Sequence, residues 1–475
     1  MKPHPFILTG IFVFAATPYI PAADGTWTQL TAGGLWSDTA NWSGGIVADG
    51  SGATADFSTL NIVSTTTVHL NSSRTIGNLT FGDAVPTGNY ERWILDDNGA
   101  PANVLTFGGS APTITVAQKF SAAIISATIA GTAGFSKAGP GWLTLEGSNT
   151  FTGTITVNGG GLYGCGSAAF GNNAAVVVSD VAGVWLDLDG DFRIGSLTGG
   201  GASGGDITLW SDSLTIGGNN SSPAPYSGRI YPGCGGGRLI KIGSGTLTLA
   251  GDNYYDSSTV INGGVLKINP TGAINSTSDV AIAGGTFDYS STTALNAPVV
   301  FSGTGNTLRG IGTISQPVSV TAGNVLSPGS GGVGEMTIAA VTLRDHSTFK
   351  VEINTSGTPS IDLLNVTGSL NLEPSAILDI SDVGADVPLA PGTTLTFLDY
   401  GGTWNGGTFD GHPDDSVFSL GSNQFQISYN GPGGIDTAVT LTAVVPEPAS
   451  VALLSFGTLL LAVRRRRGTQ PCAGG

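Results

Sequence analysis

The chain has 475 residues, of which 75 are glycine and only 11% are charged; 33 acidic against 17 basic residues give a formal net charge of −16. This balance argues against nucleic acid as a partner, because binding phosphates needs clustered Lys and Arg. Disorder is excluded as well, because 40% of the residues are hydrophobic and disordered chains lack apolar and β-branched residues. Short β-branched runs between Gly-rich turns predict an all-β fold.

The first residues have the layout of a secretory signal peptide. Lys2 precedes an apolar stretch at 6–16, and the small pair Ala22-Ala23 completes the pattern. Prolines near this pair leave the cleavage point open, and an N-terminal membrane helix is the alternative interpretation. We expect residues 1–23 to be removed on export.

Tryptophan is concentrated at the start of the mature chain, at Trp27, Trp36 and Trp42. Such a cluster could stack on carbohydrate, which would make the protein a glycan-binding adhesin using Trp36 and Trp42. However, the first coil of a stacked structure has an exposed apolar end that needs a cover. We therefore predict that residues 24–134 form an N-terminal β cap and the first coils.

The middle of the chain contains an internal repeat. Residues 137–162 and 241–266 align without a gap, and twelve of the 26 positions are identical, as KAGPGWLTLEGSNTFTGTITVNGGGL and KIGSGTLTLAGDNYYDSSTVINGGVL show. Leu143 and Leu145 point to one side of a strand and Thr144 to the other, as a period of two requires. The Asn-Gly-Gly that follows in each copy can supply the positive φ of a sharp corner.

Weaker echoes of the last strand and corner occur at 181–186, 281–287 and 320–326. Leu266 and Phe287 are 21 residues apart, and Phe287 and Leu326 are 39 apart, which is near twice that step. A step of about 20 residues with Gly corners predicts a β-solenoid, in which each coil covers the open edge of the one before. The predicted fold class is therefore a right-handed parallel β-helix or β-solenoid over residues 135–334, with a β-sandwich as the alternative.

The two full copies resemble the autotransporter-associated β-strand repeat, which is found in passenger regions of surface-exposed bacterial proteins. Segments between and after the copies, at 186–188, 194–197, 217–220, 326–329 and 365–368, occur in the family's usual order. The resemblance implies that this chain shares the passenger-type β-solenoid.

Two cysteines of the predicted mature chain, Cys165 and Cys234, each lie between glycines. An exported protein meets an oxidising compartment, so the two are a candidate disulfide pair. Sequence alone does not show that their Cα atoms come within bonding distance.

No catalytic, cofactor or metal site is predicted. Asp187, Asp189 and Asp191 suggest a calcium loop, but the glycine and glutamate that an EF-hand needs are missing. Residues 201–205 match a nucleophile elbow, yet no helix follows them. The few Lys and Arg residues form no evident cluster. A β-helix enzyme that degrades polysaccharide through paired carboxylates remains the alternative.

The segment at 335–445 has longer alternating runs, for example at 347–354 and 361–380. It is interpreted as a C-terminal β region, which is either a terminal cap or a separate small domain.

The tail begins with Pro446, Glu447 and Pro448, continues with an uncharged apolar run at 449–463, and ends in Arg464, Arg465, Arg466 and Arg467. As a single hydrophobic helix the run would rise about 22 Å, a little short of the roughly 30 Å hydrocarbon core. Arginines after such a run stay on the cytoplasmic side.

This order at 446–468 resembles the PEP-CTERM sorting signal. The resemblance implies that the tail holds an exported protein at the inner membrane as an intermediate. It also implies that an exosortase-type membrane protease cuts near Pro446-Glu447-Pro448 and that the product associates with exopolysaccharide. The predicted function is a structural or interaction protein of the cell surface or extracellular matrix, without enzymatic activity.

Overall fold

The computed structural model describes residues 22–86, 91–119, 121–171, 173–210, 213–429 and 437–445. The chain divides into two compact units, Met1–Gly237 (unit 1) and Arg238–Gly475 (unit 2). Nearly all regular structure is β; the helices among the described residues are two short 3₁₀ turns, η1 (Thr39–Asn41) and η2 (Ser43–Gly45). The all-β prediction is confirmed.

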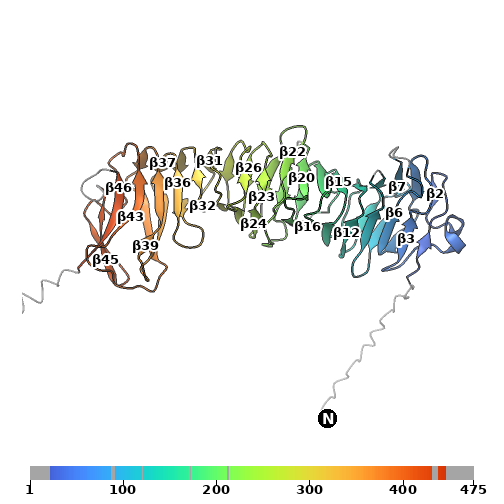
Figure 1. Cartoon of the computed structure of the whole chain (residues 1–475), viewed down its shortest axis with the longest axis horizontal. Helices are drawn as coiled ribbons and strands as arrows, with labels where there is room; N and C mark the ends of the chain where they lie inside the picture. Colours follow the sequence, from blue (N-terminus) through green and yellow to red (C-terminus); the bar gives the residue numbers. More distant parts are fainter. Residues whose placement is uncertain are drawn as a thin grey trace, which may run out of the picture. The chain divides into compact units, whose positions relative to one another are not determined.

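The strands of unit 1 are parallel and stack coil upon coil, so that neighbours in a sheet are not neighbours in sequence (Figure 1). One face is formed, in order, by β2 (Gly34–Leu35), β4 (Thr66–His69), β7 (Arg92–Asp96), β10 (Ala122–Ile125), β13 (Trp142–Leu145), β15 (Gly161–Cys165), β17 (Trp185–Asp189), β20 (Asp206–Leu209) and β22 (Ile230–Pro232). A second face is formed by β1 (Gly25–Thr26), β3 (Thr54–Phe57), β6 (Asn78–Phe81), β9 (Thr113–Val116), β12 (Gly134–Ala138), β14 (Thr154–Val157), β16 (Ala175–Val178) and β19 (Ser196–Gly199). Shorter ladders join β11 (Thr128–Ala130), β8 (Val104–Phe107) and β5 (Arg74–Ile76), and β18 (Phe192–Ile194) with β21 (Ser213–Ile216).

The N-terminal end of unit 1 is closed by tryptophan. Trp27, Trp36 and Trp42 are at most 2% exposed and surround Phe57, with ring centroids 5.6 to 5.9 Å from its ring. The indole of Trp36 donates to the carbonyl of Ala48 at 2.9 Å. These rings thus cover the first apolar residues of the stack, as a cap would, and the assignment of residues 24–134 to a cap and first coils stays a prediction. The alternative in which Trp36 and Trp42 stack on a glycan is wrong, because their rings are buried.

Unit 2 repeats the same construction. One main face is formed, in order, by β23 (Arg238–Lys241), β26 (Thr259–Ile261), β29 (Val280–Ile282) and β31 (Val299–Phe301). A second face is formed, in order, by β24 (Thr246–Leu249), β27 (Val265–Ile268), β30 (Thr286–Tyr289), β32 (Thr307–Gly310), β35 (Val325–Pro328), β38 (Thr348–Asn354) and β39 (Ser360–Ile361). β42 (Ile377–Asp382) also pairs with β38. Smaller ladders are β25 (Asp252–Asn253) with β28 (Ala273–Ile274), and β34 (Val318–Val320), β37 (Val341–Leu343) and β41 (Leu370–Leu372). The last sheet runs β33 (Thr313–Ile314), β36 (Glu335–Ile338), β40 (Leu363–Val366), β43 (Thr394–Tyr400), β46 (Ala438–Val444), β45 (Asn423–Ser428) and β44 (Val417–Leu420).

The register of unit 2 confirms the predicted step of about 20 residues. Leu266 pairs with Phe287, Phe287 with Leu308, and Leu308 with Leu326. The 39 residues between Phe287 and Leu326 are thus two coils, and the four side chains form one buried column. These stacked parallel ladders are consistent with a β-helix; its predicted right hand stays a prediction.

The C-terminal end of unit 2 departs from a purely parallel arrangement. β43, β46, β45 and β44 pair antiparallel, as do β38 and β39. The last coil of a stack leaves an open row of backbone donors and acceptors, and antiparallel strands from one short segment can cover it. The expected C-terminal β region is joined to the preceding coils, because β33 pairs with β36, β34 with β37 and β35 with β38.

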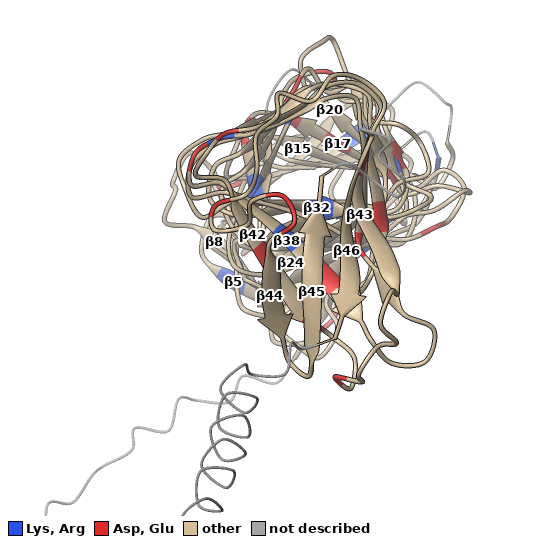
Figure 2. Cartoon of the chain, turned by 90° about the vertical axis from the view of Figure 1, so that its left-hand side faces the viewer, with Lys and Arg blue, Asp and Glu red and all other residues tan. Residues whose placement is uncertain are grey.

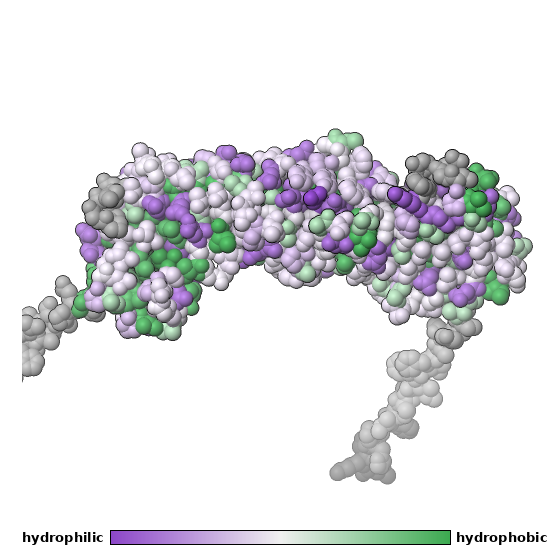
Figure 3. Space-filling view, viewed as in Figure 1, coloured by the Kyte–Doolittle hydropathy of each residue, from purple (hydrophilic) through white to green (hydrophobic). Residues whose placement is uncertain are grey.

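Most of the ribbon is uncharged, and the charged residues are scattered over separate strands and turns (Figure 2). The surface visible in Figure 3 is accordingly pale, with small separate polar and apolar areas. Within the described residues, no helix is long and apolar enough to cross a membrane. The hydrophobic helix expected at 449–463 and all but the end of the expected signal peptide lie outside that part of the chain.

Candidate functional site

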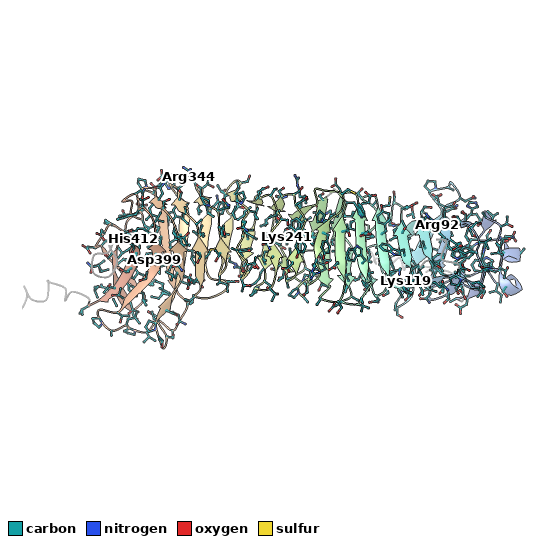
Figure 4. The ribbon with its side chains drawn as sticks, turned by 45° about the horizontal axis from the view of Figure 1, so that its top comes forward. Arg92, Lys119, Lys241, Arg344, Asp399 and His412 are labelled. Carbon is teal, nitrogen blue, oxygen red and sulfur yellow. The ribbon has the colours of Figure 1, made fainter. Side chains whose placement is uncertain are left out.

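Each copy of the repeat encloses a lysine at its Gly corner. Lys137 Nζ donates to the carbonyls of Ala138, Gly139 and Gly159 at 3.0, 2.9 and 2.7 Å. Lys241, labelled among the strands of Figure 4, does the same with Ile242, Gly243 and Gly263 at 2.6, 3.1 and 3.1 Å. The three carbonyls match the three donors of an ammonium group.

Burial lowers the pKa of Lys137 to about 7 and that of Lys241 to about 8. Neither side chain reaches the surface, since they are 0% and 1% exposed. These lysines therefore hold the corner between two strands and are not available to a ligand.

A buried asparagine fixes the next turn in each copy. Asn149 Nδ2 donates to the carbonyl of Ala169 at 2.7 Å, and its Oδ1 accepts from the amide of Ile129 at 2.7 Å. One side chain thus bridges three successive coils. Asn253, at the matching position, donates to the carbonyls of Gly251 and Ala273.

The outward side of unit 1 is different in character from these internal positions. Where β13, β15, β17, β20 and β22 lie side by side, paired residues form a continuous outward row, namely Thr144, Tyr163, Asp187, Thr208 and Tyr231. Trp142 and Trp185 come two residues before Thr144 and Asp187, and Trp210 comes two residues after Thr208, so all three lie on the same side of the sheet as this row. We call the five rings of this surface, Trp142, Tyr163, Trp185, Trp210 and Tyr231, the aromatic face.

Hydrogen bonds orient two of these rings. Trp185 Nε1 donates to Asp187 Oδ1 at 2.6 Å and to Thr208 Oγ1 at 2.8 Å, and its ring lies parallel to that of Tyr231, at 8° and 5.9 Å between centroids. Tyr163 donates its hydroxyl to Asp189 Oδ2 at 2.6 Å. The rings of Trp185 and Tyr163 are therefore held in place by side chains on the same and the neighbouring strands.

Two further rings lie over glycines of the neighbouring strand. A Cβ added to Gly161 would come within 2.3 Å of the Trp142 ring, and one added to Gly233 within 2.8 Å of the Trp210 ring. Trp142 and Trp210 nevertheless remain 39% exposed each. The missing side chains let both indoles approach the backbone while one side of each stays open to solvent.

The aromatic face is acidic. Glu146, Asp187, Asp189 and Asp206 lie on the same outward side, and Arg229 lies beside Tyr231, whose hydroxyl accepts from Arg229 Nη1 at 3.3 Å. Burial raises the pKa of Asp187, against the hydrogen bonds from Thr208 and Trp185. Burial and the Asp189 carboxylate raise the pKa of Tyr163. The surface therefore offers hydroxyl groups and negatively charged acceptors around apolar rings.

The three aspartates that suggested a calcium loop do not converge. Asp187 and Asp189 accept from Trp185 and Tyr163, whereas Asp191 accepts from the amide and hydroxyl of Ser213 at 3.0 and 2.6 Å. No group of three or more His, Cys, Asp and Glu side chains that could hold a metal is present in the described residues.

Unit 2 carries an ionic row at the corresponding outward positions. Asp288 is fully buried and accepts from Arg309 Nε at 3.1 Å and from the Ser330 hydroxyl at 2.7 Å, with Lys267 Nζ 3.7 Å away. A hollow of about 270 Å³ continues the row, lined by Arg309, Lys350 and Glu352 among others. The expectation that basic residues form no cluster is wrong, because the coils bring together cations that lie far apart in sequence.

The candidate disulfide is not formed. Both thiols are free, with Cys165 half-buried and Cys234 exposed. Cys165 ends β15, and Cys234 follows β22, which lies three strands further along the sheet. Three strand spacings amount to about 14 Å, beyond the Cα separation that a disulfide allows.

The residues predicted to direct sorting, Pro446, Glu447, Pro448 and Arg464 to Arg467, lie outside the described residues. The folded part leads directly to them, since β46 ends at Val444 and Val445 is 63% exposed.

Comparison with known families supports both resemblances. The passenger-associated-transport-repeat matches residues 135–163 and 239–268, and the PEP-CTERM protein-sorting motif matches residues 444–467. A stretch of 164 residues, 34% of the chain, is 40% identical to the adhesin BmaC autotransporter of Brucella suis biovar 1 (strain 1330). The aligned stretch spans 5% of that relative's length. The chain thus carries two passenger-type repeats and a C-terminal sorting motif.

The aromatic face was missed by the sequence analysis. A usable signal was present, because Trp142 and Trp185 each precede an alternating Leu-x-Leu strand whose leucines point inward. At the outward position before this strand the first copy has Trp142, whereas the second copy has Thr246, so the ring is not required by the repeat. Nothing in the sequence showed that these strands would be neighbours.

Proposed function

We propose that this chain, which carries a PEP-CTERM protein-sorting motif behind two passenger-associated-transport repeats, is an exported, non-enzymatic interaction protein of the bacterial surface. The tail would hold it at the inner membrane until an exosortase-type protease cuts near Pro446-Glu447-Pro448. The released β-solenoid would then act at the cell surface or in exopolysaccharide. The likeness of one third of the chain to an adhesin supports the surface role.

The observation that carries the proposal is the position of the motif relative to the fold. The match begins at Val444, the last residue of β46, and the next residue is already exposed. A protease at this point would meet an accessible strand end and would not have to unfold the last sheet. Cleavage there would leave the antiparallel end of unit 2 intact.

The test is a triple alanine substitution of Pro446, Glu447 and Pro448, with cell fractionation and mass measurement of the product. We expect wild type to lose its tail and the variant to stay uncut in the membrane fraction. A matched control replaces Thr469, Gln470 and Pro471, which lie beyond the matched motif. Equal fractionation and equal mass of wild type and triple variant would refute the sorting proposal.

The competing interpretation is a polysaccharide-degrading enzyme, for which paired carboxylates are needed. Asp187 and Asp189 are two residues apart on one strand, but each already accepts a hydrogen bond from an aromatic side chain. We expect the purified chain to release no new reducing ends from neutral or uronic glycans. Activity that disappears in Asp187→Asn with Asp189→Asn would favour the enzyme.

A further inference from the structure

We infer that the aromatic face of unit 1 binds an extended, uncharged polysaccharide. This inference rests on the proposed surface role and gives that role a ligand class and a site. The site consists of the rings at Trp142, Trp185 and Tyr231 together with the hydroxyl and carboxylate groups between them.

The coil does not need these rings. The two repeat copies share their internal leucines, lysine and asparagine, yet Trp142 corresponds to Thr246 and Tyr163 to Lys267. The second copy forms the same parallel ladder with those smaller or charged residues. Exposed large apolar side chains that gather on one surface mark a binding site more often than they stabilise a fold. The aromatic face therefore has a role outside the unit.

The rings of the aromatic face that carry the site are preorganised. The Trp185 indole is held by two hydrogen bonds across β17 and β20 and lies parallel to Tyr231. A ring that is already fixed loses little side-chain entropy when a flat apolar partner covers it. The carbon–hydrogen faces of pyranose rings are such partners.

The polar groups of the aromatic face are chemically complementary to an uncharged sugar chain. Asp187, Asp189 and Asp206 present carboxylate oxygens beside the rings, and these accept hydrogen bonds from sugar hydroxyls. The same carboxylates repel uronic acids, sulfates and phosphates, and Arg229 is the cation of this surface that the register places beside them. An uncharged glycan satisfies the acceptors and the rings together.

The length of the aromatic face suits a polymer better than a single sugar. From β13 to β22 the aromatic face crosses four strand spacings, about 19 Å, and the sheet between is continuous. Trp142 and Trp185 are two strands apart, about 10 Å, so an extended chain of several sugars can contact rings at both positions. A monosaccharide would contact one of them, and we expect it to bind more weakly.

The experiment is affinity electrophoresis of the purified full chain in gels that contain hydroxyethylcellulose, galactomannan or alginate. We expect at least one neutral polymer to retard the chain and alginate to leave it unretarded. Trp185→Ala with Tyr231→Ala should weaken binding about tenfold, because both rings of the parallel pair are lost from the site. Trp185→Phe should retain part of the binding. Tyr254→Ala, at a residue of unit 2 with the same 39% exposure as Trp142, is the matched control and should bind as wild type.

Tryptophan fluorescence of the wild-type chain, titrated with the same polymers, gives a second readout that needs no variant to fold. A shift with a neutral glycan and none with alginate would agree with the inference. The inference is overturned if no neutral polymer binds, if alginate binds equally, or if a folded double variant binds as wild type. These measurements use purified protein, so a failure here leaves the sorting result in cells unaffected, and the reverse holds too.

Discussion

The two repeat copies, 135–163 in unit 1 and 239–268 in unit 2, have the same inside and different outsides. Both bury a lysine on three carbonyls, an asparagine in the next turn and a Leu-Thr-Leu strand. Outside, the first copy begins an aromatic, acidic surface, whereas the second begins a row of ion pairs around Asp288. This fold therefore constrains the residue types at its internal positions and leaves the outward positions free to carry function.

The greatest loss of stability is expected in the ionic row of unit 2, at Asp288. Asp288→Ala removes the acceptor of Arg309, Ser290 and Ser330 and leaves Lys267 without its nearest carboxylate. We expect a loss of about 3 kcal/mol in the unfolding free energy of unit 2, toward the low end for a broken buried pair because both cations are partly exposed. Hydrogen exchange with mass spectrometry should show faster exchange in β27, β30 and β32.

The matched change in unit 1 is Asp187→Ala. The Asp187 carboxylate accepts a hydrogen bond from Trp185 and lies on the aromatic face. We expect Asp187→Ala to lower the unfolding free energy of unit 1 by less than Asp288→Ala lowers that of unit 2, because no ion pair is broken. Equal losses at both positions would mean that the outward rows do not differ as described.

A smaller effect should appear equally in both copies when the lysine is removed. Lys137→Met and Lys241→Met each leave three carbonyls without their donor. The resulting loss of unfolding free energy is partly offset, because no ammonium group has to be buried. We expect each to cost about 2 kcal/mol. Urea unfolding followed by tryptophan fluorescence reports on unit 1, which contains seven of the eight tryptophans. An unchanged midpoint for Lys137→Met would refute the role of the lysine in the corner.

Taken per pH unit, the pH dependence of the unfolding free energy that the same lysines cause is smaller still. Their pKa values, about 7 for Lys137 and about 8 for Lys241, lie below the ordinary value of 10.5. Between each folded pKa and 10.5 the unfolded chain binds more protons, so stability rises with pH, by at most about 1.4 kcal/mol per pH unit for one proton. We expect the rise to begin near pH 7 in unit 1 and near pH 8 in unit 2.

Urea midpoints of unit 1 between pH 6.5 and 9.5 test this, and Lys137→Met is the control in which the slope should vanish. A midpoint that stays constant or falls over that interval would contradict the lowered pKa of Lys137.

Much of the fold could be predicted because its determinants are local. The alternation of Leu143, Thr144 and Leu145, the Gly corners and the 21-residue step from Leu266 to Phe287 all reappear in the register. The tryptophan cap could be inferred for the same reason, since a stack must end and its end must be covered. The sorting motif was recognisable from residue order alone.

Residue order alone was enough to identify the inward half of each strand and the C-terminal sorting motif. The tertiary structure decided which outward residues are neighbours. Paired positions are 24 residues apart at Leu162 and Leu186 but 18 apart at Leu308 and Leu326, because turns of unequal length separate the coils. These leucines are buried whatever the length of the turn between them, because burial requires only an apolar residue at the inward position of each coil. The stacking of Trp185 on Tyr231, the pairing of Arg309 with Asp288 and the separation of Cys165 from Cys234 all depend on the summed turn lengths, which no single local pattern contains.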